Sequence, residues 1–98
     1  MGTNHAVSFQ TGHIGLNVSD LDRSKKFYQE VFGFTAVGES REEGRRFAFL
    51  GQEDKLVLTL WQQAEGRFEK GHPGLHHLSF QVAAIQEVQK ASRKLKEL

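Results

Sequence analysis

The chain has 98 residues, of which 38% are hydrophobic and 26% charged. This is enough for one small domain with a modest core, and it is not the composition of a disordered chain. A net charge of +1 provides no long-range field to attract nucleic acid or an anionic membrane, so neither is an expected partner. The absence of cysteine excludes disulfides and thiolate metal sites.

Residues 1–11 show no sustained pattern, and we expect a partly ordered N-terminal arm there. The arm has no basic region followed by an apolar run, and the chain has no apolar stretch of the roughly 20 residues that a membrane span needs. A cytoplasmic protein without a signal peptide is the resulting expectation.

The segment from His13 to Val18 alternates between apolar and polar residues, which predicts a half-buried strand. One face is apolar and needs a helix to cover it, whereas the other is polar but uncharged and suits a cavity better than open water. The apolar face carries Ile14, Leu16 and Val18, and the polar face carries His13, Gly15 and Asn17.

A helix is predicted next, with Ser19 as its N-cap, Asp22 three residues later, and Gly33 ending it in a left-handed conformation. Residues at helical spacing form the stripe that we expect to be buried. This stripe contains Leu21, Ser24, Phe27, Tyr28, Val31 and Phe32.

Three strands linked by hairpins should follow, over residues 34–40, 45–50 and 55–62. In the last of them, one face is predicted to carry Leu56, Leu58 and Leu60, and the other Val57, Thr59 and Trp61. Phe47 and Phe49 share one face of the middle strand, and we interpret them as core residues. Residues 12–62 are therefore predicted to form a βαβββ module of the α+β class.

The segment His77–Val82 repeats His13–Val18 position by position, and the constant offset from residue 13 to residue 77 is 64 residues. We interpret this as an internal duplication. Residues 63–75, rich in glycine, form a linker, and residues 76–98 form a truncated second module of one strand and one helix. The three hairpin-linked strands of the first copy have no counterpart in the second copy, which favours a fragment of a longer protein.

The sequence resembles the vicinal oxygen chelate superfamily, which includes glyoxalase, bleomycin-resistance proteins and extradiol dioxygenases. The resemblance is carried by residues 13–24, by Phe27-Tyr28, by Phe32-Gly33-Phe34 and by the strand from His76 to Phe80. It implies that paired βαβββ modules form a curled sheet around a metal cleft.

The resemblance further implies that His13 and His77 are metal ligands, with a divalent ion such as Zn, Ni, Mn or Fe as cofactor. Thr59 falls near the position of a third ligand, but threonine is a poor ligand, and the matching carboxylate of the second copy is absent from this sequence. If their strand face lines the cleft, Thr59 and Trp61 are candidate substrate contacts; the alternative for Trp61 is core or interface packing. No general base can be identified.

Two functions follow from the resemblance. The first is a divalent-metal-dependent enzyme, a lyase, transferase or dioxygenase acting on a small substrate chelated through adjacent oxygens. The second is a metal-free protein that binds or sequesters a small molecule, as in bleomycin resistance. Because the second module cannot bury its apolar faces alone, we also expect a homodimer. The substrate is not identified by any residue pattern.

Overall fold

The computed structural model describes residues 7–98, so the first six residues of the predicted arm lie outside the described residues. The elements in chain order are β1 (Ile14–Val18), α1 (Leu21–Phe32), β2 (Thr35–Glu42), β3 (Arg45–Gln52), β4 (Lys55–Gln62) and α2 (Ile85–Glu97). The predicted α+β class and the βαβββ order of the first module are confirmed.

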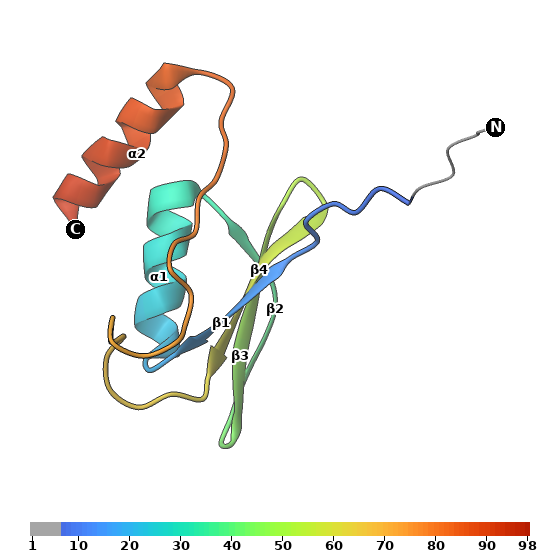
Figure 1. Cartoon of the computed structure of the whole chain (residues 1–98), viewed down its shortest axis with the longest axis vertical. Helices are drawn as coiled ribbons and strands as arrows, with labels where there is room; N and C mark the ends of the chain where they lie inside the picture. The colour runs from blue at the N-terminus through green and yellow to red at the C-terminus, as the bar shows by residue number, and fades with distance from the viewer. Residues whose placement is uncertain (1–6) are drawn as a thin grey trace.

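The four strands form one sheet in the order β1-β4-β3-β2 (Figure 1). The two hairpins pair β2 with β3 and β3 with β4 in antiparallel fashion, whereas β1 runs parallel to β4. Parallel neighbours need a long crossover between them, and α1 with the two hairpins provides it. Both β1 and β2 are edge strands of this sheet.

Helix α1 covers one face of the sheet (Figure 1), and the core lies between them. The side chains at its centre are at most 6% exposed, which is the outcome expected for the apolar face of an alternating strand. They are Leu21, Phe34, Ala48, Leu50, Leu58 and Leu60. Phe27 was predicted to be buried with them, but it remains 36% exposed at the margin of the helix stripe.

The N-cap of α1 is Asp20 rather than the predicted Ser19. Asp20 has an extended backbone, and its Oδ1 accepts a hydrogen bond from the Arg23 amide at 3.1 Å. At the other end Gly33 is left-handed, with φ of 73°, and its amide donates to the carbonyl of Gln29. The helix thus ends as predicted but begins one residue later.

Ion pairs join α1 to the edge strand β2. Arg41 binds Asp22, and the Lys25 ammonium lies 2.6 Å from a carboxylate oxygen of Glu39. The hydrogen bond from Arg41 lowers the pKa of Asp22 below its ordinary value, and the hydrogen bond from Lys25 does the same for the pKa of Glu39. These contacts are exposed, so they fix the orientation of the helix more than they stabilise it.

A β-bulge interrupts the predicted alternation of β4. The pairing shifts between Leu50↔Leu58 and Gly51↔Leu56, which leaves Val57 as the extra residue. Val57 packs against the core instead of lying on the opposite face with Thr59. The face assignment of Val57 was therefore wrong, while Leu58 and Leu60 are buried as predicted.

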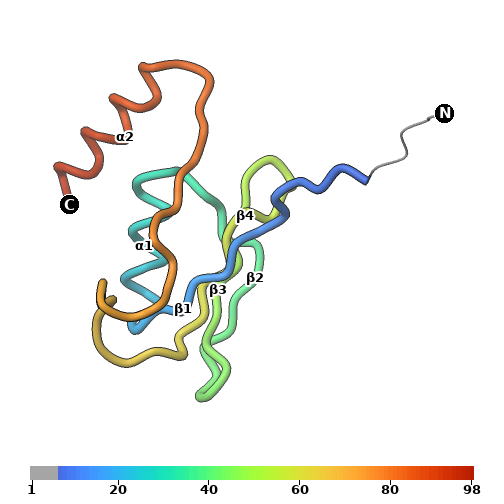
Figure 2. The backbone as a smooth tube through the Cα atoms, viewed as in Figure 1, coloured from blue at the N-terminus to red at the C-terminus, as the bar shows by residue number. Residues whose placement is uncertain are grey.

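The predicted strand over His77–Val82 does not form; these residues have no sheet pairing. Figure 2 shows the segment running alongside α1, where Phe80 contacts Phe32 and Phe34 with ring centroids 5.0 and 5.4 Å apart. Leu78 packs against the same core. A strand requires a partner, and because the segment lies against the helix it reaches no sheet edge.

The predicted second helix forms as α2, which lies beside α1 on the side away from the sheet (Figure 1). Its apolar stripe remains open to solvent: Ile85 is 62% exposed, Val88 51% and Leu95 49%. No helix within residues 7–98 has the length and apolar character needed to cross a membrane.

Replacing Leu58 by Ala is expected to lower the free energy of unfolding by about 2–5 kcal/mol, because Leu58 is fully buried. Leu75→Ala is the matched control, since it removes the same atoms from a half-exposed side chain in the linker, and it should cost only about 0.5 kcal/mol. Urea denaturation measures both. Equal losses in the two variants would show that the core does not lie under α1.

Candidate functional site on the open face of the sheet

The face of the sheet opposite α1 carries the candidate site. Directly paired residues share a face, so the register builds two rows across the strands. One row is Gly15, Thr59, Phe49 and Gly38, and the other is Asn17, Trp61, Phe47 and Ser40. Within residues 7–98, no helix covers this face (Figure 1), which we call the open face.

A hydrogen bond joins the two predicted substrate contacts. The Trp61 indole Nε1 donates to the Thr59 hydroxyl oxygen at 3.0 Å. Thr59 is only 4% exposed although it lies on the uncovered side of the sheet. The bond holds the indole over Thr59 and fixes its orientation, which the sequence did not predict.

Gly15 makes room for this pair on the neighbouring strand. A Cβ atom at position 15 would lie 3.1 Å from the Thr59 hydroxyl oxygen and 4.0 Å from Trp61 Nε1. That first distance is shorter than ordinary van der Waals contact, so a larger residue would push the threonine hydroxyl from its position. The small residue at position 15 is therefore a requirement of the Thr59–Trp61 contact.

Three aromatic rings cluster on the open face. The ring centroids of Phe47 and Phe49 are 4.8 Å apart, and that of Trp61 lies 5.2 Å from Phe47 and 5.8 Å from Phe49. All three side chains are half-buried. Phe47 and Phe49 were interpreted as core, which was wrong: the core is formed by Ala48 and Leu50, on the other side of the same strand.

The two predicted metal ligands lie in different parts of the structure. His13 is exposed immediately before β1, in the alternation that carries Gly15 and Asn17 to the open face. His77 is exposed in the segment beside α1, and its Nδ1 lies 3.1 Å from Nδ1 of His76. Their joint coordination of an ion remains a prediction.

The donors within residues 7–98 of one chain do not form a site for a divalent metal. Among residues 7–98, no group of three or more His, Asp or Glu side chains is placed to hold an ion, whereas protein metal sites of this kind use at least three. Thr59 offers no replacement, because its hydroxyl is buried and accepts from Trp61. A complete metal site would need donors from outside this set.

Comparison with known proteins agrees with the fold described above. Residues 10–98 match the family described as the Glyoxalase/Bleomycin resistance protein/Dioxygenase superfamily. Two solved structures share the fold. A glyoxylase/bleomycin resistance protein/dioxygenase domain from Frankia sp. EAN1pec has a TM-score of 0.77 and 25% identity, covering 94% of this chain and 74% of that one. A possible glyoxalase from Bacillus cereus has a TM-score of 0.69 and 28% identity, covering 92% and 74%.

Two curated relatives carry names that describe an activity. A probable trivalent organoarsenical cleaving enzyme of Bacillus subtilis is 34% identical over 85 residues, covering 87% of this chain and 53% of the relative. A lactoylglutathione lyase of Haemophilus influenzae is 50% identical over 44 residues, covering 43% of this chain and 33% of the relative. The chain thus spans about half the length of the first relative and a third of the second.

Gly15→Ala is expected to displace the Thr59 hydroxyl and weaken its bond from Trp61, shifting the emission of the single tryptophan. The added methyl should lower the free energy of unfolding by roughly 1–3 kcal/mol, the usual cost of overpacking. Gly38→Ala is the matched control, because its Cβ would meet Phe49 at an ordinary 3.6 Å. Unchanged fluorescence and stability in Gly15→Ala would contradict the requirement for glycine.

Proposed function

This chain belongs to the Glyoxalase/Bleomycin resistance protein/Dioxygenase superfamily, and we propose that it binds a small-molecule substrate on its open face as part of an enzyme. The observation that carries the proposal is the trio of half-buried rings, Phe47, Phe49 and Trp61, on an uncovered sheet face. Aromatic side chains with a few fixed polar groups are the usual lining of a small-molecule site.

The polar groups beside the rings suit recognition of oxygen-bearing molecules. Asn17 and Ser40 lie in register with Trp61 and Phe47, so their side chains flank the rings from either side. The Thr59–Trp61 bond removes one rotational freedom of the indole before a ligand arrives, and such preorganisation lowers the entropic cost of binding. A planar or apolar molecule with polar substituents fits this arrangement best.

The names of the relatives support a lyase-type reaction, in which a bond of the bound molecule is cleaved or rearranged. A divalent metal remains part of the proposal, with His13 and His77 as its ligands. Since residues 7–98 of one chain do not supply a complete donor set, we assign metal binding to an assembly in which His77 of a second molecule and at least one further donor lie near His13.

A metal-free binding protein is the second candidate function. It is favoured by the buried Thr59, whose hydroxyl is engaged by Trp61 and not free for an ion. The aromatic face would then hold its ligand by stacking and by hydrogen bonds alone. Both candidates use the same surface, so the metal content of the protein distinguishes them.

His13→Ala is expected to remove stoichiometric Zn, Ni, Mn or Fe from the purified protein, as measured by elemental analysis after extensive dialysis. His72→Ala is the matched control, because His72 lies exposed in the linker beside Glu69 and should retain the metal. Wild-type protein without metal, even after reconstitution with each ion, would contradict the enzyme proposal and leave the metal-free candidate.

The assembly should be a homodimer, in which the stripe of Ile85, Val88 and Leu95 packs against a second copy. Val88→Asp introduces a charge into this stripe and is expected to give monomers in light scattering coupled to gel filtration. Gln86→Asp adds the same charge outside the stripe on the exposed surface of α2, and it should leave the dimer intact. A wild-type protein that is monomeric at high micromolar concentration would contradict this assembly.

A further inference from the structure

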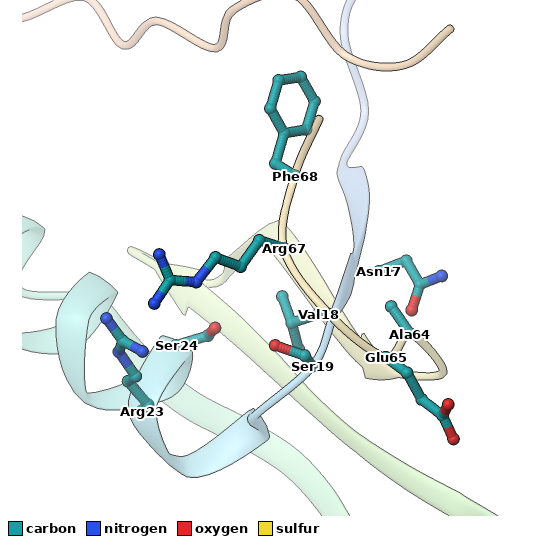
Figure 3. Close-up of a pocket in the computed structure, with 10 residues that line it drawn as sticks. Asn17, Val18, Ser19, Arg23, Ser24, Ala64, Glu65, Arg67 and Phe68 are labelled. Atoms are coloured by element: carbon teal, nitrogen blue, oxygen red, sulfur yellow. The ribbon is translucent and has the colours of Figure 1, made fainter. Parts of the chain in front are cut away.

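A hollow of about 520 Å³ lies at the carboxyl end of β1, between the first turn of α1 and the linker that follows β4. Figure 3 shows the side chains that line it. Two of these are arginines from segments far apart in sequence, Arg23 on α1 and Arg67 in the linker. The hollow shares Asn17 with the open face but extends beyond it, because its wall also includes the first turn of the helix that covers the opposite side of the sheet.

The two guanidinium groups share the hollow without a carboxylate between them. In Figure 3 the Arg67 side chain reaches across to the first turn of α1, where the Arg23 guanidinium lies. Within the described residues neither forms an ion pair, and the carboxylate of Asp22, the residue before Arg23, is paired with Arg41. Two like charges facing one solvent-filled space repel each other unless an anion lies between them.

Within the described residues, the acidic groups near the hollow form no ion pair with either arginine. Glu65 belongs to the lining, but its carboxylate points away from both arginines, to the other side of the linker (Figure 3). Asp20, just before α1, directs its Oδ1 to the Arg23 amide as the helix cap. The positive potential of the two guanidinium groups is therefore available to a ligand.

Hydrogen bonds fix the linker that carries Arg67. The amide of Gln63 donates to the Asn17 side-chain oxygen at 3.0 Å, and the amide of Ala64 donates to the Val18 carbonyl at 3.4 Å. Gly66 then adopts φ of 87°, a left-handed conformation that glycine alone adopts without strain. These contacts turn the chain so that Arg67 faces α1.

We propose that this hollow binds the phosphate group of a small molecule, held between Arg23 and Arg67. The first amides of α1 are not what makes the site, since Leu21 donates to Gln62 and Arg23 to Asp20. The ligands are side chains: two guanidinium groups, which bind phosphate oxygens in bidentate fashion, and the hydroxyls of Ser19 and Ser24, which line the same wall. A tetrahedral dianion matches this set of donors.

The test is a titration of the 98-residue chain with inorganic phosphate at constant ionic strength and about pH 8, where phosphate is doubly charged. Amide shifts of Ser19, Ser24 and Gly66 in two-dimensional NMR spectra report on the hollow. Arg23→Gln and Arg67→Gln should each weaken binding by about tenfold or more. Arg93→Gln is the matched control, because it removes the same charge from an exposed position on α2, and it should change binding less than about twofold.

Further arms distinguish the source of the phosphate and test the class of ligand. Binding of glycerol phosphate at least as tight as that of inorganic phosphate indicates a phosphate ester, and tighter binding of inorganic phosphate indicates the free ion; either outcome supports the site. Tighter binding of malonate than of both would overturn a phosphate site in favour of a carboxylate site. The phosphate site would also be overturned if Arg93→Gln weakened binding as much as Arg23→Gln and Arg67→Gln do. The same holds if phosphate caused no shifts at these amides in protein that gives native spectra.

Discussion

Unequal covering of the two faces of one sheet is the constraint on which the structure depends. Helix α1 is the only helix in residues 7–98 that packs closely on β3 and β4, and it buries Leu50, Leu58 and Leu60 completely. In a chain of this size one such layer accounts for most of the hydrophobic stabilisation. The opposite face is thereby left to carry function, because its side chains are not needed to hold the helix.

The side chains of the open face nevertheless have fixed positions. Thr59 is nearly as buried as the core leucines, but the atoms around it come from the sheet itself, with Trp61 folded back over it. Gly15 permits this arrangement from the neighbouring strand by having no side chain. Three residues on two strands thus produce a rigid indole, whereas an unsupported tryptophan on an uncovered sheet would be free to change rotamer.

Much of the first module could be predicted from the sequence, because alternation and helical spacing depend on local geometry. The strands of residues 12–62, the helix and its glycine end were found in this way, and so were the faces of Leu58 and Thr59. The bulge at Val57 could not be predicted, since it arises from how β3 and β4 register against each other. Asp20 and Ser19 are both good caps, and only the backbone angle of Asp20 decides between them.

The second copy shows more clearly what the alternation of apolar and polar residues cannot predict. His77–Val82 has the same alternation as His13–Val18, yet only the first hexamer is a strand. The difference is the partner: Ile14 to Val18 pair with β4, while Leu78 and Phe80 bury their side chains beside α1. Alternation specifies which side chains will be buried, but the tertiary contact specifies where. For the same reason spacing alone could not establish a ligand set for His13 and His77.

The two proposed sites are connected through the end of β1. Asn17 lies in register with Trp61 on the open face, and its side-chain oxygen holds the amide of Gln63 at the start of the linker that carries Arg67. Gln62, the last residue of β4, accepts from the first amide of α1. The same short stretch of backbone therefore sets the position of the aromatic ring and that of the arginine. An anion bound at Arg67 would therefore add a further contact to a linker that Asn17 and Val18 already anchor.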